Sequence, residues 1–265
     1  MSRIIAIANQ KGGVGKTTTA INLGACLAVA ERSTLIVDAD PQGNATSGLG
    51  VDRDQLSRSI YDVLLEGASA DEVVQSEVHF GALDLLPSHR DLLGAEVAMA
   101  TRQGRETLLR DAVEPIRDRY EYVIIDSPPS LGLLTVNTLA AADTVLIPIQ
   151  CEYYALEGLT QLLNTVRLVQ RSLNPSLQIE GVLLTMFNDR LNLSRQVADE
   201  AREYFGPKVF RTSIPRNIRL AEAPSFGKPI ISYDVLSSGA TSYLALAQEL
   251  MSRNGSGQKT AEATR

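Results

Sequence analysis

The sequence has no tryptophan, only two cysteines and two histidines, and no long hydrophobic run. Cys26 and Cys151 lie far apart and no Cys-x-x-Cys occurs, which excludes a cysteine-based zinc site and a disulfide framework. We expect both to be small buried apolar residues. His79 and His89 are too few for a histidine-rich metal centre. No segment approaches the roughly 18 uncharged apolar residues of a transmembrane helix.

The N-terminal apolar run, Ile4–Ala8, ends at once in Asn9 and is too short for a signal-peptide core. We therefore expect a cytoplasmic protein. The 265 residues are 44% hydrophobic and 21% charged, which excludes wholesale disorder. The net charge of −6 argues against a surface that is basic all over. Binding to nucleic acid would need a local basic patch.

Strand-like apolar runs alternate with longer stretches of helical periodicity. The runs are Ile4–Ala8, Thr34–Val37, Leu83–Leu86, Tyr122–Ile125, Thr144–Ile149 and Gly181–Met186. The clearest helical stretches are Thr17–Ala30, Arg105–Arg117, Leu133–Ala141, Leu156–Leu173, Leu193–Phe205 and Ala240–Met251. This alternation predicts a single-domain α/β fold, with a doubly wound, mostly parallel sheet and helices on both faces. We assign residues 1–252 to that domain and expect the polar tail, residues 253–265, to be disordered.

A glycine-rich segment stands between the first strand and the first helix. It reads Asn9-Gln-Lys-Gly-Gly-Val-Gly-Lys-Thr-Thr18. A turn of this kind points backbone N–H groups at phosphate oxygens, and the helix N-terminus adds partial positive charge. Lys16 can then reach the β- and γ-phosphates, and the Thr17 hydroxyl can hold Mg²⁺. The residues predicted to bind ATP here are Lys11, Gly12, Gly13, Val14, Gly15, Lys16, Thr17 and Thr18.

Three carboxylates follow two of the predicted strands. Asp38 and Asp40 end one strand and Asp126 ends another, at the sheet edge where ligands of open α/β sheets bind. They would repel one another unless a cation lay among them, and Mg²⁺ bound to a triphosphate supplies one. We assign Asp126 as the Walker B carboxylate, acting through a Mg²⁺-bound water, and Asp40 as the residue that orients the attacking water. For Asp38 the alternative of a helix or turn cap carries equal weight.

The loop departs from the G-x-x-x-x-G-K-[ST] pattern, because Gln10 replaces the first glycine and Lys11 follows it. In this it resembles the deviant Walker A ATPases, whose loop reads K-G-G-x-x-K-[ST]. The resemblance implies that Lys11 reaches the ATP of the other subunit in a dimer. A solvated surface lysine is the alternative.

Longer segments resemble the chromosomal ParA/Soj partition ATPases. They are Asp38-Ala-Asp-Pro-Gln-Gly-Asn-Ala-Thr-Ser-Gly-Leu-Gly50, Gln150-Cys-Glu-Tyr-Tyr-Ala-Leu-Glu-Gly158 and Ile214-Pro-Arg-Asn-Ile-Arg-Leu-Ala-Glu-Ala-Pro224. The resemblance covers about residues 3–250. It implies that Pro215 and Asn217 lie against the adenine and that Glu152 lies near the dimer interface.

The same resemblance implies a function. An ATP-dependent sandwich dimer would bind double-stranded DNA without sequence preference, and a ParB-type centromere-binding protein would stimulate hydrolysis and release it. The protein would then be associated with the nucleoid. The polar C-terminus has no apolar face of the kind that takes MinD-type relatives to membranes, so we expect no membrane partner. The alternative is a MinD-like or cargo-positioning regulator that does not bind DNA.

A local basic region makes DNA binding compatible with an acidic chain. Residues 186–228 contain eight basic and five acidic side chains, a local net charge of +3. Dimerisation would double any patch on one face and the phosphates that it contacts. We assign Arg190, Arg195 and Arg219 to DNA, whereas Arg216 belongs either there or to the nucleotide site. An ordinary solvated set of arginines is the alternative.

Overall fold

Six parallel strands form one sheet in the computed structural model, which describes residues 2–152 and 157–262. Their order is β3-β2-β4-β1-β5-β6. The strands are β1 (Arg3–Ile7), β2 (Thr34–Asp38), β3 (Leu83–Leu86), β4 (Tyr122–Asp126), β5 (Thr144–Gln150) and β6 (Gln178–Thr185). The chain leaves β1 toward one side of the sheet and later crosses to the other side, so the order reverses beside β1. Ligands bind at such a switch point, outside the carboxyl ends of the strands.

Each face of the sheet has its own hydrophobic core. Successive side chains of a strand point to opposite faces, so Ile5 and Ile7 enter one core while Ile4 and Ala6 enter the other. Burial on both faces explains why the strands are continuous apolar runs. Cys26 lies in one core and Cys151 in the other, both free and buried, which confirms that they are apolar packing residues.

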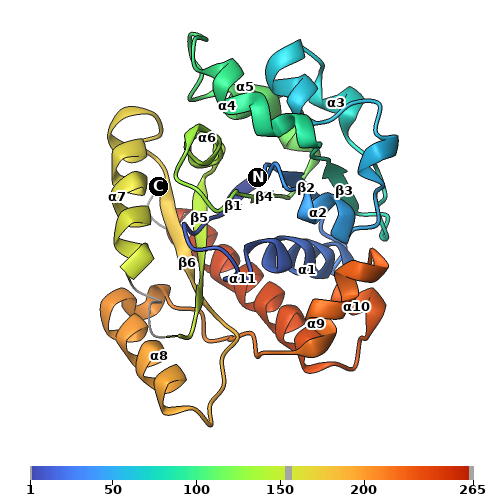
Figure 1. The fold of residues 1–265 in the computed structure, drawn as a ribbon. Coiled ribbons are helices and arrows are strands. Elements are labelled where there is room, and N and C mark those ends of the chain that lie inside the picture. Colours follow the sequence, from blue (N-terminus) through green and yellow to red (C-terminus); the bar gives the residue numbers. More distant parts are fainter. Residues whose placement is uncertain (1, 153–156, 263–265) are drawn as a thin grey trace.

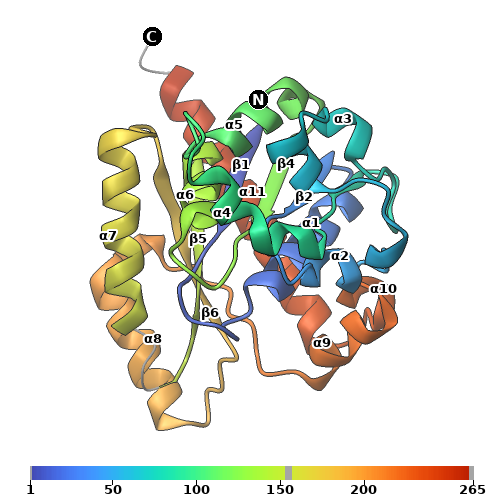
Figure 2. The same cartoon turned by 45° about the horizontal axis from the view of Figure 1, so that its top comes forward.

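Helices cover both faces of the sheet (Figures 1 and 2). Packed into the core of Ile4 are α3 (Ala70–Val73), α4 (Ala95–Met99), α5 (Leu108–Val113), α6 (Leu133–Ala141), α7 (Glu157–Ser172) and α8 (Asn192–Phe205). Packed into the core of Ile5 are α1 (Lys16–Val29), α2 (Asn44–Gly48), α9 (Ile218–Glu222), α10 (Ile230–Tyr233) and α11 (Ser238–Glu262). The predicted fold class is confirmed, and all six strands of the sheet run parallel. Within the described residues, no helix combines the length and apolarity that crossing a membrane requires.

The predicted elements are present, with shifted ends. The helix predicted over Arg105–Arg117 begins only at Leu108, and it tightens into a 3-10 turn, η4 (Glu114–Arg119), because Pro115 cannot donate a helical hydrogen bond. Leu156, predicted to start a helix, lies outside the described residues. The five shortest helices were not predicted, since four or five residues are too few to show helical periodicity.

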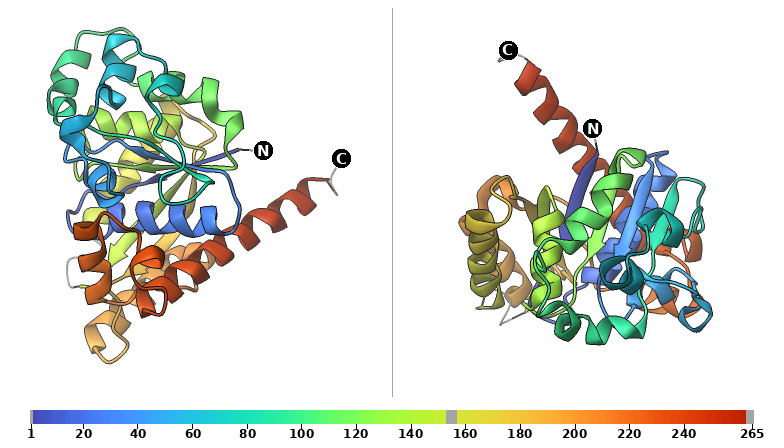
Figure 3. Two further views of the ribbon diagram at one scale, coloured as in Figure 1. Left: turned by 90° about the vertical axis from the view of Figure 1, so that its right-hand side faces the viewer. Right: turned by 90° about the horizontal axis from the view of Figure 1, so that it is seen from above.

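Helix α11 continues through Glu262, into the segment 253–265 for which the sequence predicts a disordered tail, and the disorder of that tail stays a prediction. Arg253 ties the helix to the domain just beyond the packed part. Its Nη2 donates to the carbonyl of Val209 at 2.9 Å and to Oε1 of Glu249 at 2.6 Å. Extending an existing helix costs far less than starting one, so the anchored helix carries its polar end onward. Figure 3 shows this end projecting away from the body.

Candidate nucleotide site

The glycine-rich loop connects β1 to α1 at the carboxyl edge of the sheet. Gly13 and Gly15 have φ values of 74° and 88°, a left-handed backbone that glycine adopts without strain. Thr185, at the end of β6, donates its hydroxyl to the carbonyl of Val14 at 2.8 Å. Asn9 donates to the carbonyl of Pro148 at 2.7 Å and accepts from the N–H of Lys11 at 3.0 Å. Neighbouring strands therefore fix the loop from both ends.

Lys16 begins α1 and is only 6% exposed. Its Nζ donates to the carbonyl of Lys11 at 3.2 Å, so the side chain folds back across the loop. Burial lowers the pKa of Lys16, against the attraction of Asp126 and Asp40, which raises it. A buried ammonium beside a glycine-rich turn at a helix N-terminus is suited to an anionic ligand.

Asp126 ends β4 and is fully buried. Its Oδ2 accepts from the Thr17 hydroxyl at 2.6 Å, whereas Oδ1 is buried and has no hydrogen-bond partner among the residues that the structure describes. Burial and the nearby Asp38 and Asp40 raise its pKa well above the ordinary value. A free carboxylate oxygen beside a hydroxyl is the oxygen donor set that Mg²⁺ prefers, so these residues fit the predicted ion.

Asp38 supports the loop that follows β2. Its Oδ2 accepts from the N–H and the hydroxyl of Thr46 at 2.8 and 2.7 Å, and its Oδ1 from the N–H of Asp40 at 3.3 Å. Thr46 lies in the first turn of α2, so the Asp38 carboxylate accepts a hydrogen bond from a backbone N–H at the N-terminus of that helix. This is the capping role that the sequence left open as an alternative. Burial raises the pKa of Asp38 to about 6.

Asp40 lies on the same loop and is 5% exposed. Its Oδ1 accepts from the N–H of Gln42 at 2.9 Å. Burial raises its pKa, while that N–H group and the positive charges of Lys16 and Arg53 oppose the rise. The structure thus brings Asp40 into electrostatic reach of Lys16 and Asp126, as the strand-end argument predicted.

The three residues assigned to the adenine and the interface occupy one neighbourhood. Pro215 pairs with Phe187 just beyond β6. Glu152, beyond β5, accepts from Arg216 at 3.2 Å. Asn217 caps α9, accepting from the N–H of Leu220 at 3.2 Å. None of these three contacts tests the predicted roles of the residues, which stay predictions.

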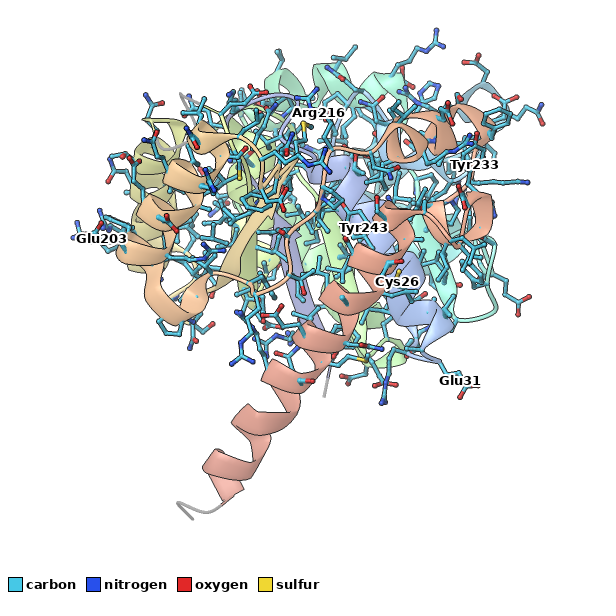
Figure 4. All side chains as sticks on the ribbon, turned by 90° about the horizontal axis from the view of Figure 1, so that it is seen from below. Cys26, Glu31, Glu203, Arg216, Tyr233 and Tyr243 are labelled. Atoms are coloured by element: carbon cyan, nitrogen blue, oxygen red, sulfur yellow. The ribbon has the colours of Figure 1, made fainter. Side chains whose placement is uncertain are left out.

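The arginines assigned to DNA do not form one cluster. Arg190 lies on the loop before α8, and its side chain has no hydrogen bond or ion pair to any residue that the structure describes. Arg195 lies on α8 beside Asn192. Arg219, on α9, instead pairs with Glu222 at 2.9 Å and Asp234 at 3.5 Å. In Figure 4, Arg216 lies between α8, which carries Glu203, and α10, which carries Tyr233.

Sequence reasoning missed three residues that hold the site together. They are Thr185, which anchors Val14; Ser88, whose hydroxyl donates to the Asp40 carbonyl at 2.8 Å; and Arg53, which contacts the loop after Asp40. Thr185 and Ser88 stand far in sequence from the groups that they contact, Arg53 stands 11 and 12 positions away, and none of the three belongs to a short motif. In the sequence, only the position of Thr185 at the end of a strand could have indicated that it lies near the ligand-binding edge of the sheet.

Comparison with known proteins agrees with this geometry. A family model described as an AAA domain matches residues 2–179. The chain is 58% identical to the chromosome partitioning protein ParA of Myxococcus xanthus, over 96% of this chain and 89% of that protein. It is 56% identical to the sporulation initiation inhibitor protein Soj of Bacillus subtilis, over 94% and 98%. The structure of cobyrinic acid a,c-diamide synthase from Mycobacterium smegmatis, with bound ATP analogue and magnesium, matches with a TM-score of 0.86 at 38% identity, covering 97% of each chain.

The parallel sheet, the glycine-rich loop and the strand-end carboxylates define an ATPase of the P-loop class. Within that class, the chain belongs to the ParA/Soj family of chromosome partitioning ATPases. The predicted family is confirmed.

Proposed function

We propose that this ATPase works as an ATP-dependent sandwich dimer that binds DNA without sequence preference. The observation that carries the proposal is the unequal use of the two loop lysines. Lys16 is buried and folded into its own loop. Lys11 is half-buried, and its side chain makes no hydrogen bond or ion pair with any residue in 2–152 and 157–262. Gly12 and Gly13 beside it are exposed, with open space where a Cβ would stand.

Within one subunit, each polar group has a distinct task. Lys16 and the N–H groups of the loop hold the β- and γ-phosphates. Thr17 and, through a water, Asp126 hold Mg²⁺, which neutralises charge on the phosphates when bound. Asp40 orients the attacking water. The catalytic set is thus Lys11, Lys16, Asp40 and Asp126, with Glu152, Pro215 and Asn217 around the base and the interface.

The dimer is tested by changing the loop without changing Lys16. Lys11→Ala should leave nucleotide binding by the monomer largely intact and weaken ATP-dependent dimerisation. Gly12→Val should block dimerisation, since it adds bulk where two backbones would approach. The mass of the particle is measured with ATP and with ADP, and Lys208→Ala, an exposed lysine elsewhere, serves as the control. An unchanged ATP dimer in both loop variants contradicts the sandwich arrangement.

DNA binding is proposed for the surface around α8. Arg190 and Arg195 are exposed and engage no carboxylate in the described part of the chain, so their charges are available to phosphates. In a dimer each would be present twice, which steepens the dependence of affinity on salt. The γ-phosphate of ATP would then control DNA binding, because it would favour the dimer, which binds DNA, over the monomer. The protein would be cytoplasmic and associated with the nucleoid.

We assign the release of the dimer from DNA to ATP hydrolysis. Hydrolysis would be slow in the protein alone and accelerated by a ParB-type partner. The family membership supports this step, and also favours it over a MinD-like or cargo-positioning role without DNA. Plasmid DNA and anionic liposomes, added to separate ATP-loaded samples, distinguish these functions. Binding to DNA but not to liposomes is expected; the reverse result supports the alternative.

A further inference from the structure

Arg53 reaches back to the loop that carries Asp40. It opens a 3-10 turn, η1 (Arg53–Gln55), which lies just beyond α2. Its Nη2 donates to the carbonyl of Pro41 at 3.1 Å, and its Nη1 donates to the carbonyl of Gln42. One guanidinium therefore contacts two consecutive carbonyls through two different nitrogens, a rigid planar arrangement that the single nitrogen of an ammonium does not have.

The remaining polar groups of this loop are also engaged. The carbonyl of Asp40 accepts from the hydroxyl of Ser88 at 2.8 Å and from the N–H of Gly43 at 2.9 Å. The Asp40 carboxylate accepts from the N–H of Gln42 at 2.9 Å. Arg53 thus completes the set of bonds that fixes the backbone from Asp40 to Gln42. Without it, two carbonyls of the turn would have no protein partner among the described residues.

Gly43 leaves the space that the guanidinium of Arg53 occupies. Gly43 has φ 61°, and a Cβ built there would collide with Nε and Cζ of Arg53. Glycine at this position therefore serves both the left-handed turn and the close approach of the arginine. The Arg53 turn is itself held, because Asp52 accepts from the N–H of Asp54 at 3.0 Å, and Asp54 accepts from Arg90 at 2.7 Å.

Arg53 also contributes charge at the right place. Burial raises the pKa of Asp40, and the positive charges of Lys16 and Arg53 both attract its carboxylate and oppose that rise. Under the proposed function Lys16 engages the phosphates, which leaves Arg53 as the other cation that acts on Asp40. Among the described residues Arg53 makes no hydrogen bond to Lys16, Thr17 or Asp126, and its hydrogen bonds go to the loop that carries Asp40.

We propose that Arg53 is a positioning residue for hydrolysis, because its guanidinium straddles the carbonyls of Pro41 and Gln42 and thereby holds Asp40 toward the attacking water. This inference rests on the proposed role of Asp40. Displacing a water-orienting group by a fraction of an ångström lowers turnover strongly but leaves ground-state binding alone. Arg53 should therefore affect kcat much more than the affinity for ATP.

The test compares Arg53→Gln with Arg58→Gln. Each variant removes one arginine charge, and the two positions are five residues apart in the sequence. Arg58, however, is exposed and pairs with Glu72, away from the loop. For Arg53→Gln we expect kcat for phosphate release to fall about tenfold, with the Kd for MgATP and ATP-dependent dimerisation within about twofold of wild type. Arg58→Gln should match wild type. Arg53→Lys should recover only part of the turnover, because an ammonium keeps the charge but carries its donors on one nitrogen and lacks the rigid fork that fixes both carbonyls.

Gly43→Ala supplies an independent check. It should lower kcat as Arg53→Gln does, and the double variant should lose less than the product of the two separate effects. Unchanged kcat in Arg53→Gln overturns the proposal, and so does an equal loss of ATP affinity and kcat. Asp40→Ala separates this failure from failure of the proposed function. If Asp40→Ala turns over normally, the role of Asp40 is wrong; if it is inactive while Arg53→Gln is normal, only the inference about Arg53 falls.

Discussion

The nucleotide site and the basic surface are built in opposite ways. At the site, Lys16, Asp38 and Asp126 are buried and held by hydrogen bonds from different strands and loops. On the surface, Arg190 and Arg195 are exposed and stand on one loop and one helix. The site is preorganised by the fold, whereas DNA binding by the surface, under the proposed function, would depend on the number of charges and on a second subunit. Substitutions at the site should therefore abolish a function, and substitutions on the surface should weaken one gradually.

Lys16→Ala gives the largest expected effect. It removes the buried charge that faces the phosphates, so ATP affinity should fall by about 100-fold or more. The measurement uses a labelled nucleotide, because the chain has no tryptophan to report binding. Lys208→Ala, which removes an exposed lysine, should bind like wild type. Wild-type affinity in Lys16→Ala would exclude the loop as the phosphate site.

Asp40→Ala should separate binding from hydrolysis. The variant should bind ATP and dimerise, since Asp40 is assigned to the water and not to a phosphate, but it should lose most turnover. It should therefore accumulate as an ATP dimer that stays on DNA. Turnover is followed by phosphate release, with Asp91→Ala, an exposed aspartate beside His89, as the control. Normal partner-stimulated turnover would show that Asp40 has another role.

Charge reversals on the basic surface should have smaller and unequal effects. Arg190→Glu should weaken DNA binding more than Arg219→Glu, because Arg219 is already engaged by two carboxylates. The salt dependence should also become shallower in Arg190→Glu. Arg32→Glu, which changes a residue that pairs with Glu121 beyond the end of α1, should leave DNA binding unchanged.

These affinities are measured by titrating ATP-loaded protein with unrelated DNA duplexes at several salt concentrations. Affinity should be similar for each sequence, since phosphate contacts carry no base information. If Arg190→Glu and Arg219→Glu both bind as tightly as wild type, with the same salt slope, the DNA surface lies elsewhere.

The smallest effect concerns pH and stability at the site. The pKa of Asp38 is about 6 in the folded chain, against an ordinary value of 3.8 for an aspartate in an unfolded chain. At a pH between these two values, Asp38 is therefore protonated in the native state and ionised in the unfolded state. The free energy of unfolding should therefore decrease as the pH rises from about 4 to about 6. In Asp38→Asn this part of the slope should vanish. Urea denaturation of both proteins without nucleotide or Mg²⁺ measures it, and equal slopes would contradict the assignment.

The sequence determined the elements and motifs whose residues stand close together. Burial on both faces produces the apolar strands, and strands that alternate with helices require a parallel sheet. The loop from Lys11 to Thr18 was predictable for the same reason, because a strand, a glycine turn and a helix follow one another directly. Family resemblance added Glu152, Pro215 and Asn217, which no local pattern marks.

Tertiary structure decided the contacts between residues that are distant in sequence. Thr185 anchors Val14 across 171 positions, and Asp126 meets Thr17 across 109. It also decided that Arg219 is paired and that Arg253 contacts the carbonyl of Val209, since a sequence gives the charge of a residue but not its neighbour. Arg53 shows this most clearly. In the sequence it is one arginine among many, and only the fold places its guanidinium on the loop that carries Asp40.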